Sequence, residues 1–169
     1  MTRSGAVLAV LSLLTALLQL GAMPTLFLGG VAAPLLPVAL IAEWATARGE
    51  REAWAAVLIA SIVLGVASQE RVGWFLLALL PTAALSTLAL GIFAARSTAA
   101  RRLASAPVVA AGGTLLYLAV LALASGRVAA LGQQLSAGIA AAAWTALVAS
   151  LIALVLWPLQ LRTSRGLFE

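Results

Sequence analysis

The sequence contains no cysteine and no histidine, and its charges come only from ten arginines and five glutamates. Without cysteine the chain can form neither a disulfide nor a reactive thiolate. A metal site would have to depend on glutamate, and no two glutamates lie in separate apolar segments. The residues of a catalytic triad, a pair of acids at catalytic separation and a phosphate-binding glycine loop are also missing. The sequence therefore predicts a protein that is not an enzyme and that carries neither a metal nor an organic cofactor.

What the sequence does contain is apolar. Hydrophobic residues make up 64% of it and charged residues only 9%, whereas a soluble domain is about half apolar and about a quarter charged. A soluble fold of this length could not bury so much apolar surface. The arginines lie between apolar stretches rather than on one surface, so the high pI of 11.6 does not indicate nucleic-acid binding. The composition predicts an all-α, polytopic membrane protein.

A membrane-spanning helix needs about 20 mostly apolar residues, and six stretches satisfy this requirement. They are residues 5–22, 26–47, 51–68, 74–95, 106–125 and 136–161. We expect them to form one bundle of about six helices and a single transmembrane domain over residues 1–169. Gly29, Gly30, Pro34 and Pro37 interrupt the second stretch. Its regular helix is expected to begin only near Pro34, with either helix or a re-entrant loop before it.

The orientation follows from the arginines in the connections. Eight lie on one side of the predicted membrane and two on the other; the eight are Arg3, Arg48, Arg51, Arg96, Arg101, Arg102, Arg162 and Arg165, and the two are Arg71 and Arg127. Cytoplasmic connections carry the excess of basic residues. Both termini are therefore predicted to be cytoplasmic. The first stretch follows Arg3 but has no small-residue cleavage site, so we expect a retained helix rather than a signal peptide.

Glu43 is the only charge set within an apolar stretch, and it lies directly before Trp44 and five residues before Arg48. An ionisable residue inside a membrane helix is costly and is a functional candidate. Two interpretations remain open. Glu43 either reaches the interface and pairs with Arg48 or Arg51, or it anchors a neighbouring subunit. The candidate partner contacts are Glu43, Trp44, Arg48 and Arg51.

Small residues and one proline are the candidate positions for helix packing. Pro81 lies inside the fourth stretch and is expected to bend it, because proline lacks a backbone donor. Gly138 and Ala142 have the small-xxx-small spacing that permits close helix approach. Packing within the chain is favoured over a dimer interface. The complete set of packing candidates is Pro81, Gly112, Gly113, Gly138 and Ala142.

Several short motifs are similar to those of one bacterial family. They are Leu17-Leu18-Gln19 at the end of the first stretch, Pro34-Leu35-Leu36, Arg48-Gly49-Glu50-Arg51-Glu52, Ser68-Gln69-Glu70-Arg71-Val72-Gly73, and Trp157-Pro158-Leu159 with Arg162. With them, the chain resembles the MreD family of the rod-shape (elongasome) system over nearly its whole length. Leu35 and Gly65 stand where that family commonly has aspartate, so no role of those positions is carried over.

The resemblance implies a non-catalytic scaffold subunit in the bacterial inner membrane. Such a subunit would bind MreC and help to couple MreB filaments to RodA, to its partner penicillin-binding transpeptidase and thus to peptidoglycan synthesis. Membrane lipids would surround it, and it would have no nucleic-acid partner. Lateral helix contacts would hold it in the complex.

A second function class remains open: the substrate-capturing membrane subunit of an energy-coupling-factor vitamin transporter. Such subunits also have six helices, and they need polar groups that converge on a cavity near the outer face. The predicted outer ends of the helices offer Glu70, Arg71, Trp74, Arg127, Gln133 and Gln134. A small channel or exporter is less favoured, because no stretch carries a line of polar residues.

Overall fold

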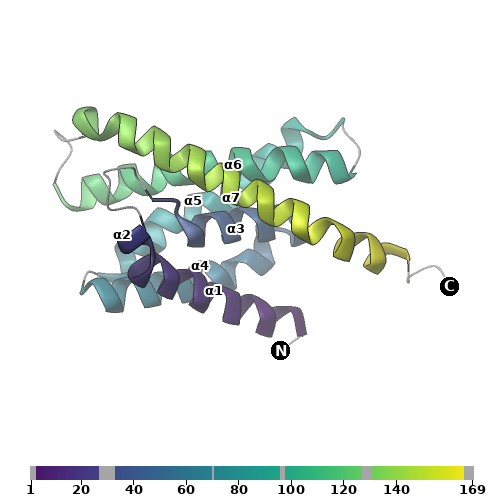
Figure 1. The fold of residues 1–169 in the computed structure, drawn as a ribbon, viewed down its shortest axis with the longest axis horizontal. Helices are drawn as coiled ribbons and strands as arrows, with labels where there is room; N and C mark the ends of the chain where they lie inside the picture. The colour runs from purple at the N-terminus through teal and green to yellow at the C-terminus, as the bar shows by residue number, and fades with distance from the viewer. Residues whose placement is uncertain (1–2, 27–32, 70, 96–97, 127–130, 166–169) are drawn as a thin grey trace.

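Every regular element is a helix in the part of the chain that the computed structural model describes, which comprises residues 3–26, 33–69, 71–95, 98–126 and 131–165. The helices are α1 (Arg3–Gly21), α2 (Met23–Leu26), α3 (Leu36–Arg48), α4 (Glu50–Ser68), α5 (Val72–Ile92), α6 (Thr98–Ala124) and α7 (Leu131–Arg165). The prediction of an all-α fold with transmembrane helices is confirmed. Figure 1 shows the first turn of α1 and the last turns of α7 at the same end of the bundle.

The number of long spans differs from the six expected. Within the described residues, four helical segments are long and apolar enough to cross a membrane: Glu50–Ser68, Val72–Ile92, Ala100–Ala124 and Leu135–Val155. The apolar part of α1, Gly5–Gly21, is slightly shorter. The expectation of a span over 26–47 is wrong. That stretch contains the end of the one-turn helix α2 and the short helix α3, while residues 27–32 lie outside the described part.

Helix α3 is short and occupies the centre of the bundle. Its 13 residues rise about 20 Å, at 1.5 Å per residue, which is well below the roughly 30 Å of a hydrocarbon core. It packs against α1, α4, α5, α6 and α7, and Figure 1 shows it among them. Nine of its residues are buried. Its neighbours, rather than lipid, therefore surround most of α3.

Two prolines account for where α3 begins. Ala33 and Leu35 flank Pro34 in non-helical backbone, and the residue before a proline is disfavoured in the α region. Pro37 lies in the first turn, where its missing N–H removes no helical hydrogen bond. The expected helix start near Pro34 is thus close to the observed start at Leu36. The re-entrant loop expected before it falls on residues outside the described part.

The end of α3 and the start of α4 share one glycine. Gly49 has φ +102°, a backbone conformation that side chains with a Cβ rarely adopt. Its N–H donates a hydrogen bond to the carbonyl of Ala45, and Glu50 and Glu52 follow in the first turn of α4. Acidic residues in the first turn interact favourably with the helix dipole. The turn from α3 into α4 is therefore tight.

A glycine of α6 lies in close contact with α5. A Cβ built on Gly113 would lie 2.8 Å from Cγ2 of Thr82, which no real side chain tolerates. One on Gly112 would lie 3.3 Å from Leu85, and one on Gly138 of α7 would lie 3.5 Å from Leu118, an ordinary contact. These packing candidates, together with the buried Ala142, lie at contacts within the chain. Helix α5 continues through Pro81 from Val72 to Ile92.

Candidate functional site

Glu43 lies inside the bundle rather than on its surface. It is 3% exposed, and its Oε2 has no hydrogen-bond partner among the described residues. Burial is the main influence on this carboxylate, and the charge of Arg102 on α6 also acts on it. Glu43 therefore does not reach the surface of the bundle, where Arg48 and Arg51 are exposed. In five residues a helix turns by about 500°, so Arg48 projects from a different face of α3.

The other candidate contacts surround the turn between α3 and α4. The indole N–H of Trp44 donates a hydrogen bond of 3.4 Å to Oε2 of Glu52, and this long bond links the last turn of α3 to the first turn of α4. Trp44 itself is half-buried. The structure thus separates the four predicted contacts: Glu43 faces the interior, Trp44 bridges two helices, and Arg48 and Arg51 remain available at the surface.

The opposite end of α3 is held by two neutral side chains from distant parts of the chain. The N–H of Leu36 donates to Oε1 of Gln19 on α1 at 2.8 Å. The N–H of Leu35 donates to Oγ1 of Thr145 on α7 at 2.9 Å. The first backbone donors of a helix have no partner within that helix, and an unpaired donor at membrane depth costs several kcal/mol. Gln19 and Thr145 satisfy two of these donors.

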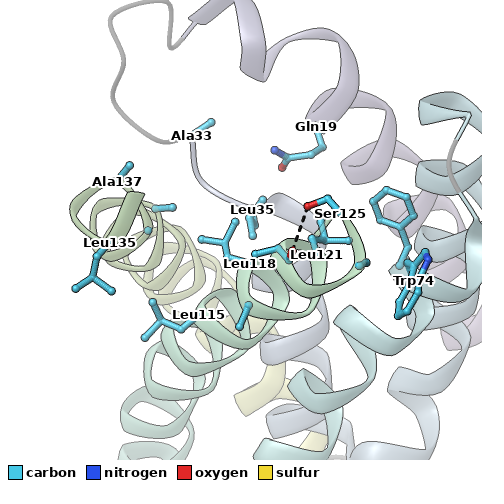
Figure 2. Close-up of a pocket in the computed structure, with 16 residues that line it drawn as sticks. Gln19, Ala33, Leu35, Trp74, Leu115, Leu118, Leu121, Ser125, Leu135 and Ala137 are labelled. Atoms are coloured by element: carbon cyan, nitrogen blue, oxygen red, sulfur yellow. Dashed lines mark hydrogen bonds between the residues drawn. The ribbon is translucent and has the colours of Figure 1, made fainter. Parts of the chain in front are cut away.

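A cavity of about 940 Å³ opens beside this end of α3. Its walls come from the end of α1, from residues 33–35, from the start of α5, and from the facing halves of α6 and α7. The lining residues are Gln19, Ala33, Leu35, Trp74, Phe75, Leu115, Leu118, Ala119, Leu121, Ala122, Ala124, Ser125, Leu135, Ala137, Gly138 and Ala141. Figure 2 shows the amide of Gln19 above Leu35 and Ser125, with Leu115, Leu118 and Leu135 on the α6 and α7 side. The cavity lies at the end that the arginine count predicts to be extracytoplasmic.

The chemistry of the cavity wall is almost entirely apolar. Among the lining residues that the structure describes, none is charged, and only Gln19, Trp74 and Ser125 bring polar side-chain atoms. Ser125 donates its hydroxyl to the carbonyl of Ala122 at 3.2 Å, the bond drawn as a dashed line in Figure 2. Oε1 of Gln19 already accepts the bond from Leu36. Since an amide has two donors on its nitrogen, the NH₂ group of Gln19 is the main polar group that the wall offers.

Six outer residues were predicted for a substrate site, and of those whose side chains the structure describes, Trp74 lines this cavity. Arg71 is exposed next to α5. Glu70 and Arg127 lie outside the described residues, as do the side chains of Gln133 and Gln134. No role in the site was predicted for Gln19 or Thr145 from the sequence. The signal that could have found them is a polar residue in an apolar span, which requires a partner at membrane depth.

Most of the other buried hydroxyl groups are bonded to their own helices. Thr46, Ser61, Ser86, Thr114 and Thr145 each donate to a carbonyl three or four residues earlier. Ser12 and Thr82 are buried and have no partner within the described part of the chain. The five bonded hydroxyls therefore satisfy their hydrogen bonds within their own helices.

No protein-family model matches the chain, and neither a curated protein nor a solved structure matches it.

Proposed function

We propose that the chain is a non-catalytic scaffold subunit of the bacterial rod-shape complex that binds MreC and helps to couple MreB filaments to peptidoglycan synthesis. The sequence resemblance to the MreD family motivates this proposal. The structural observation that supports it is the use of polar side chains. Gln19, Thr145 and Trp44 bond to the chain's own backbone or side chains, and Glu43 faces inward.

The outward surface complements this arrangement. Helix α1 presents Val7, Val10, Leu14 and Leu17 outward, each about half exposed. Helix α7 presents Leu135, Ile139, Leu147, Leu151 and Leu154. Lipid and the transmembrane helix of a partner meet such faces equally well, because lateral packing holds membrane helices together. Such surfaces permit a function that depends on lateral contacts with other membrane proteins.

Co-purification in detergent with an MreC homologue tests the proposal, combined with depletion of the chain in cells. We expect a stable complex, and loss of rod shape on depletion. A photo-crosslinking residue at Val10 on α1 or at Leu147 on α7 locates the face, because both side chains are about half exposed. Absence of binding together with unchanged cell shape would contradict the proposal.

The cavity favours a second candidate, the substrate-capturing subunit of an energy-coupling-factor transporter. Its volume of about 940 Å³ is at the upper end of the range for small-molecule pockets. Gln19 and Trp74 are the polar residues that would orient a substrate. Co-purification with transporter ATPase subunits, and neighbouring genes for those subunits, would support this candidate over the scaffold. Neighbouring genes for MreB and MreC would favour the scaffold.

A further inference from the structure

The cavity beside α3 is wide because small residues line the facing halves of α6 and α7. Ala119, Ala122, Ala137, Gly138 and Ala141 occupy positions where larger side chains would fill the space. The two helices are in contact along the bundle, yet here their side chains leave about 940 Å³. The cavity is partly open to the surroundings, so a molecule can enter it from outside, and its volume falls within the range of ligand pockets.

Water does not fit the chemistry of the wall. A buried water needs two to four polar partners, and the α6 and α7 side of the cavity offers Leu115, Leu118, Leu121 and Leu135 together with alanines. Ser125 uses its hydroxyl proton on Ala122. Most of the wall residues belong to helical segments long and apolar enough to cross a membrane, and in a membrane such segments are surrounded by hydrocarbon. An aliphatic chain gains dispersion contacts with every side of this wall.

Gln19 is the main polar group that a molecule bound in the cavity would meet. Its Oε1 is fixed on the N–H of Leu36, which leaves its NH₂ group as a donor at the mouth of the cavity. Trp74 brings a second N–H near the start of α5, and it is 36% exposed. Both groups donate, so they suit an oxygen acceptor such as an ester carbonyl or a phosphate oxygen. A polar, vitamin-like molecule would need more such groups along the walls.

We infer that this cavity binds one aliphatic chain of a membrane lipid, with the oxygen-bearing end of the lipid at Gln19 and Trp74 and the chain between α6 and α7. The inference does not rest on the proposed scaffold function. The same chemistry would accept an acyl chain of a bulk phospholipid or an isoprenoid chain. These two sources differ in mass, which the first experiment below resolves.

Native mass spectrometry of the full-length protein, extracted from its membrane into detergent and washed, tests the inference. We expect a bound lipid on the unmodified protein and at least about tenfold less on Ala122→Phe, equivalent to about 1.4 kcal/mol, because the added ring fills the cavity. Gly138→Leu is a second filling variant, since the space at Gly138 is open to within 3.5 Å of Leu118. Ala143→Phe is the matched control, because Ala143 is exposed on α7 and does not line the cavity. Equal lipid retention by all variants, or only detergent bound to the unmodified protein, would overturn the inference.

Tryptophan fluorescence in vesicles of phosphatidylcholine with brominated acyl chains gives an independent measurement. Two variants retain a single tryptophan, Trp74 or Trp144, with the other four replaced by phenylalanine. Both side chains are exposed to a similar extent, 36% and 43%, but only Trp74 lines the cavity. We expect Trp74 to be quenched at a lower fraction of brominated lipid, and Ala122→Phe to remove this difference. Equal quenching of the two tryptophans without Ala122→Phe would overturn the inference.

Discussion

The two ends of α3 are stabilised by different kinds of residues. At its first turn, two neutral side chains from α1 and α7 accept hydrogen bonds from the backbone, and a wide apolar cavity lies beside them. At its last turns, Glu43 is buried under the influence of Arg102, and Gly49 turns the chain directly into α4. We call the first-turn end, which lies beside the cavity and has neutral partners, the open end. The last-turn end, which carries an ionisable residue and leads directly into α4, is the closed end.

The difference shows what a helix too short for the membrane requires. Its first turn ends within the protein, where backbone donors need acceptors because no water is present. Its last turn lies at the end of the bundle that the arginine count predicts to be cytoplasmic. Charged side chains are tolerated there. The open end therefore depends on long-range partners for its stability, while the closed end depends on electrostatics and on a local turn.

The largest effect is expected at the open end. The double variant Gln19→Leu with Thr145→Val leaves the N–H groups of Leu35 and Leu36 unpaired. Each unpaired buried donor costs about 1–3 kcal/mol, so the free energy of unfolding should fall by about 2–6 kcal/mol. Unfolding in mixed detergent micelles measures it. Thr145→Ser is the control, because it keeps the acceptor oxygen and should lose far less. A double variant as stable as this control would show that the caps contribute little.

An intermediate effect is expected at the closed end. A double-mutant cycle of Glu43→Gln and Arg102→Gln should give a coupling energy of about 0.5–3 kcal/mol, as interacting residues do. The matched cycle uses Arg101→Gln, because Arg101 is adjacent on α6 but the charge that acts on Glu43 is that of Arg102. Thermal unfolding in detergent at fixed pH measures both cycles. A larger coupling with Arg101 than with Arg102 would contradict this assignment.

The smallest effect is expected at the turn between α3 and α4. Trp44→Phe removes the 3.4 Å hydrogen bond to Glu52 and keeps most of the aromatic packing. The bond is long and exposed, so its loss should cost below about 0.5 kcal/mol, at the low end for a hydrogen bond. Glu52→Gln retains an acceptor oxygen for Trp44 and serves as the control in the same unfolding measurement. If Trp44→Phe lowered the free energy of unfolding as much as the double variant of Gln19 and Thr145, the prediction that the open end contributes more stability would be wrong.

The sequence predicted the local features of α3 and failed on its surroundings. Pro34 and Pro37 are local signals, and they place the helix start within a few residues of Leu36. Composition and hydropathy predicted the all-α membrane class in the same way. The number of long spans was wrong for two reasons: the regular helix in the stretch 26–47 begins only at Leu36, and the apolar part of α1, Gly5–Gly21, is slightly too short.

The partners of α3 were not predictable, because they depend on how distant segments meet. Thr145 is 110 residues away from Leu35 along the chain, and Gln19 is 17 residues from Leu36. Glu43 was misplaced for a related reason. Its closeness to Arg48 in sequence indicated a pair, but residues five apart do not share a helix face. The rotation of α3 within the bundle decides that Glu43 meets α6.

The hydrogen bond between Leu35 and Thr145 also sets an order of events during synthesis. A ribosome adds about 5–20 residues per second, so the 110 residues between the two partners take roughly 6–22 s to appear. Throughout that interval α3 is too short to remain across the bilayer alone and lacks one of its caps. The complete set of hydrogen bonds at the start of α3 can therefore form only after Thr145 of α7 has been synthesised.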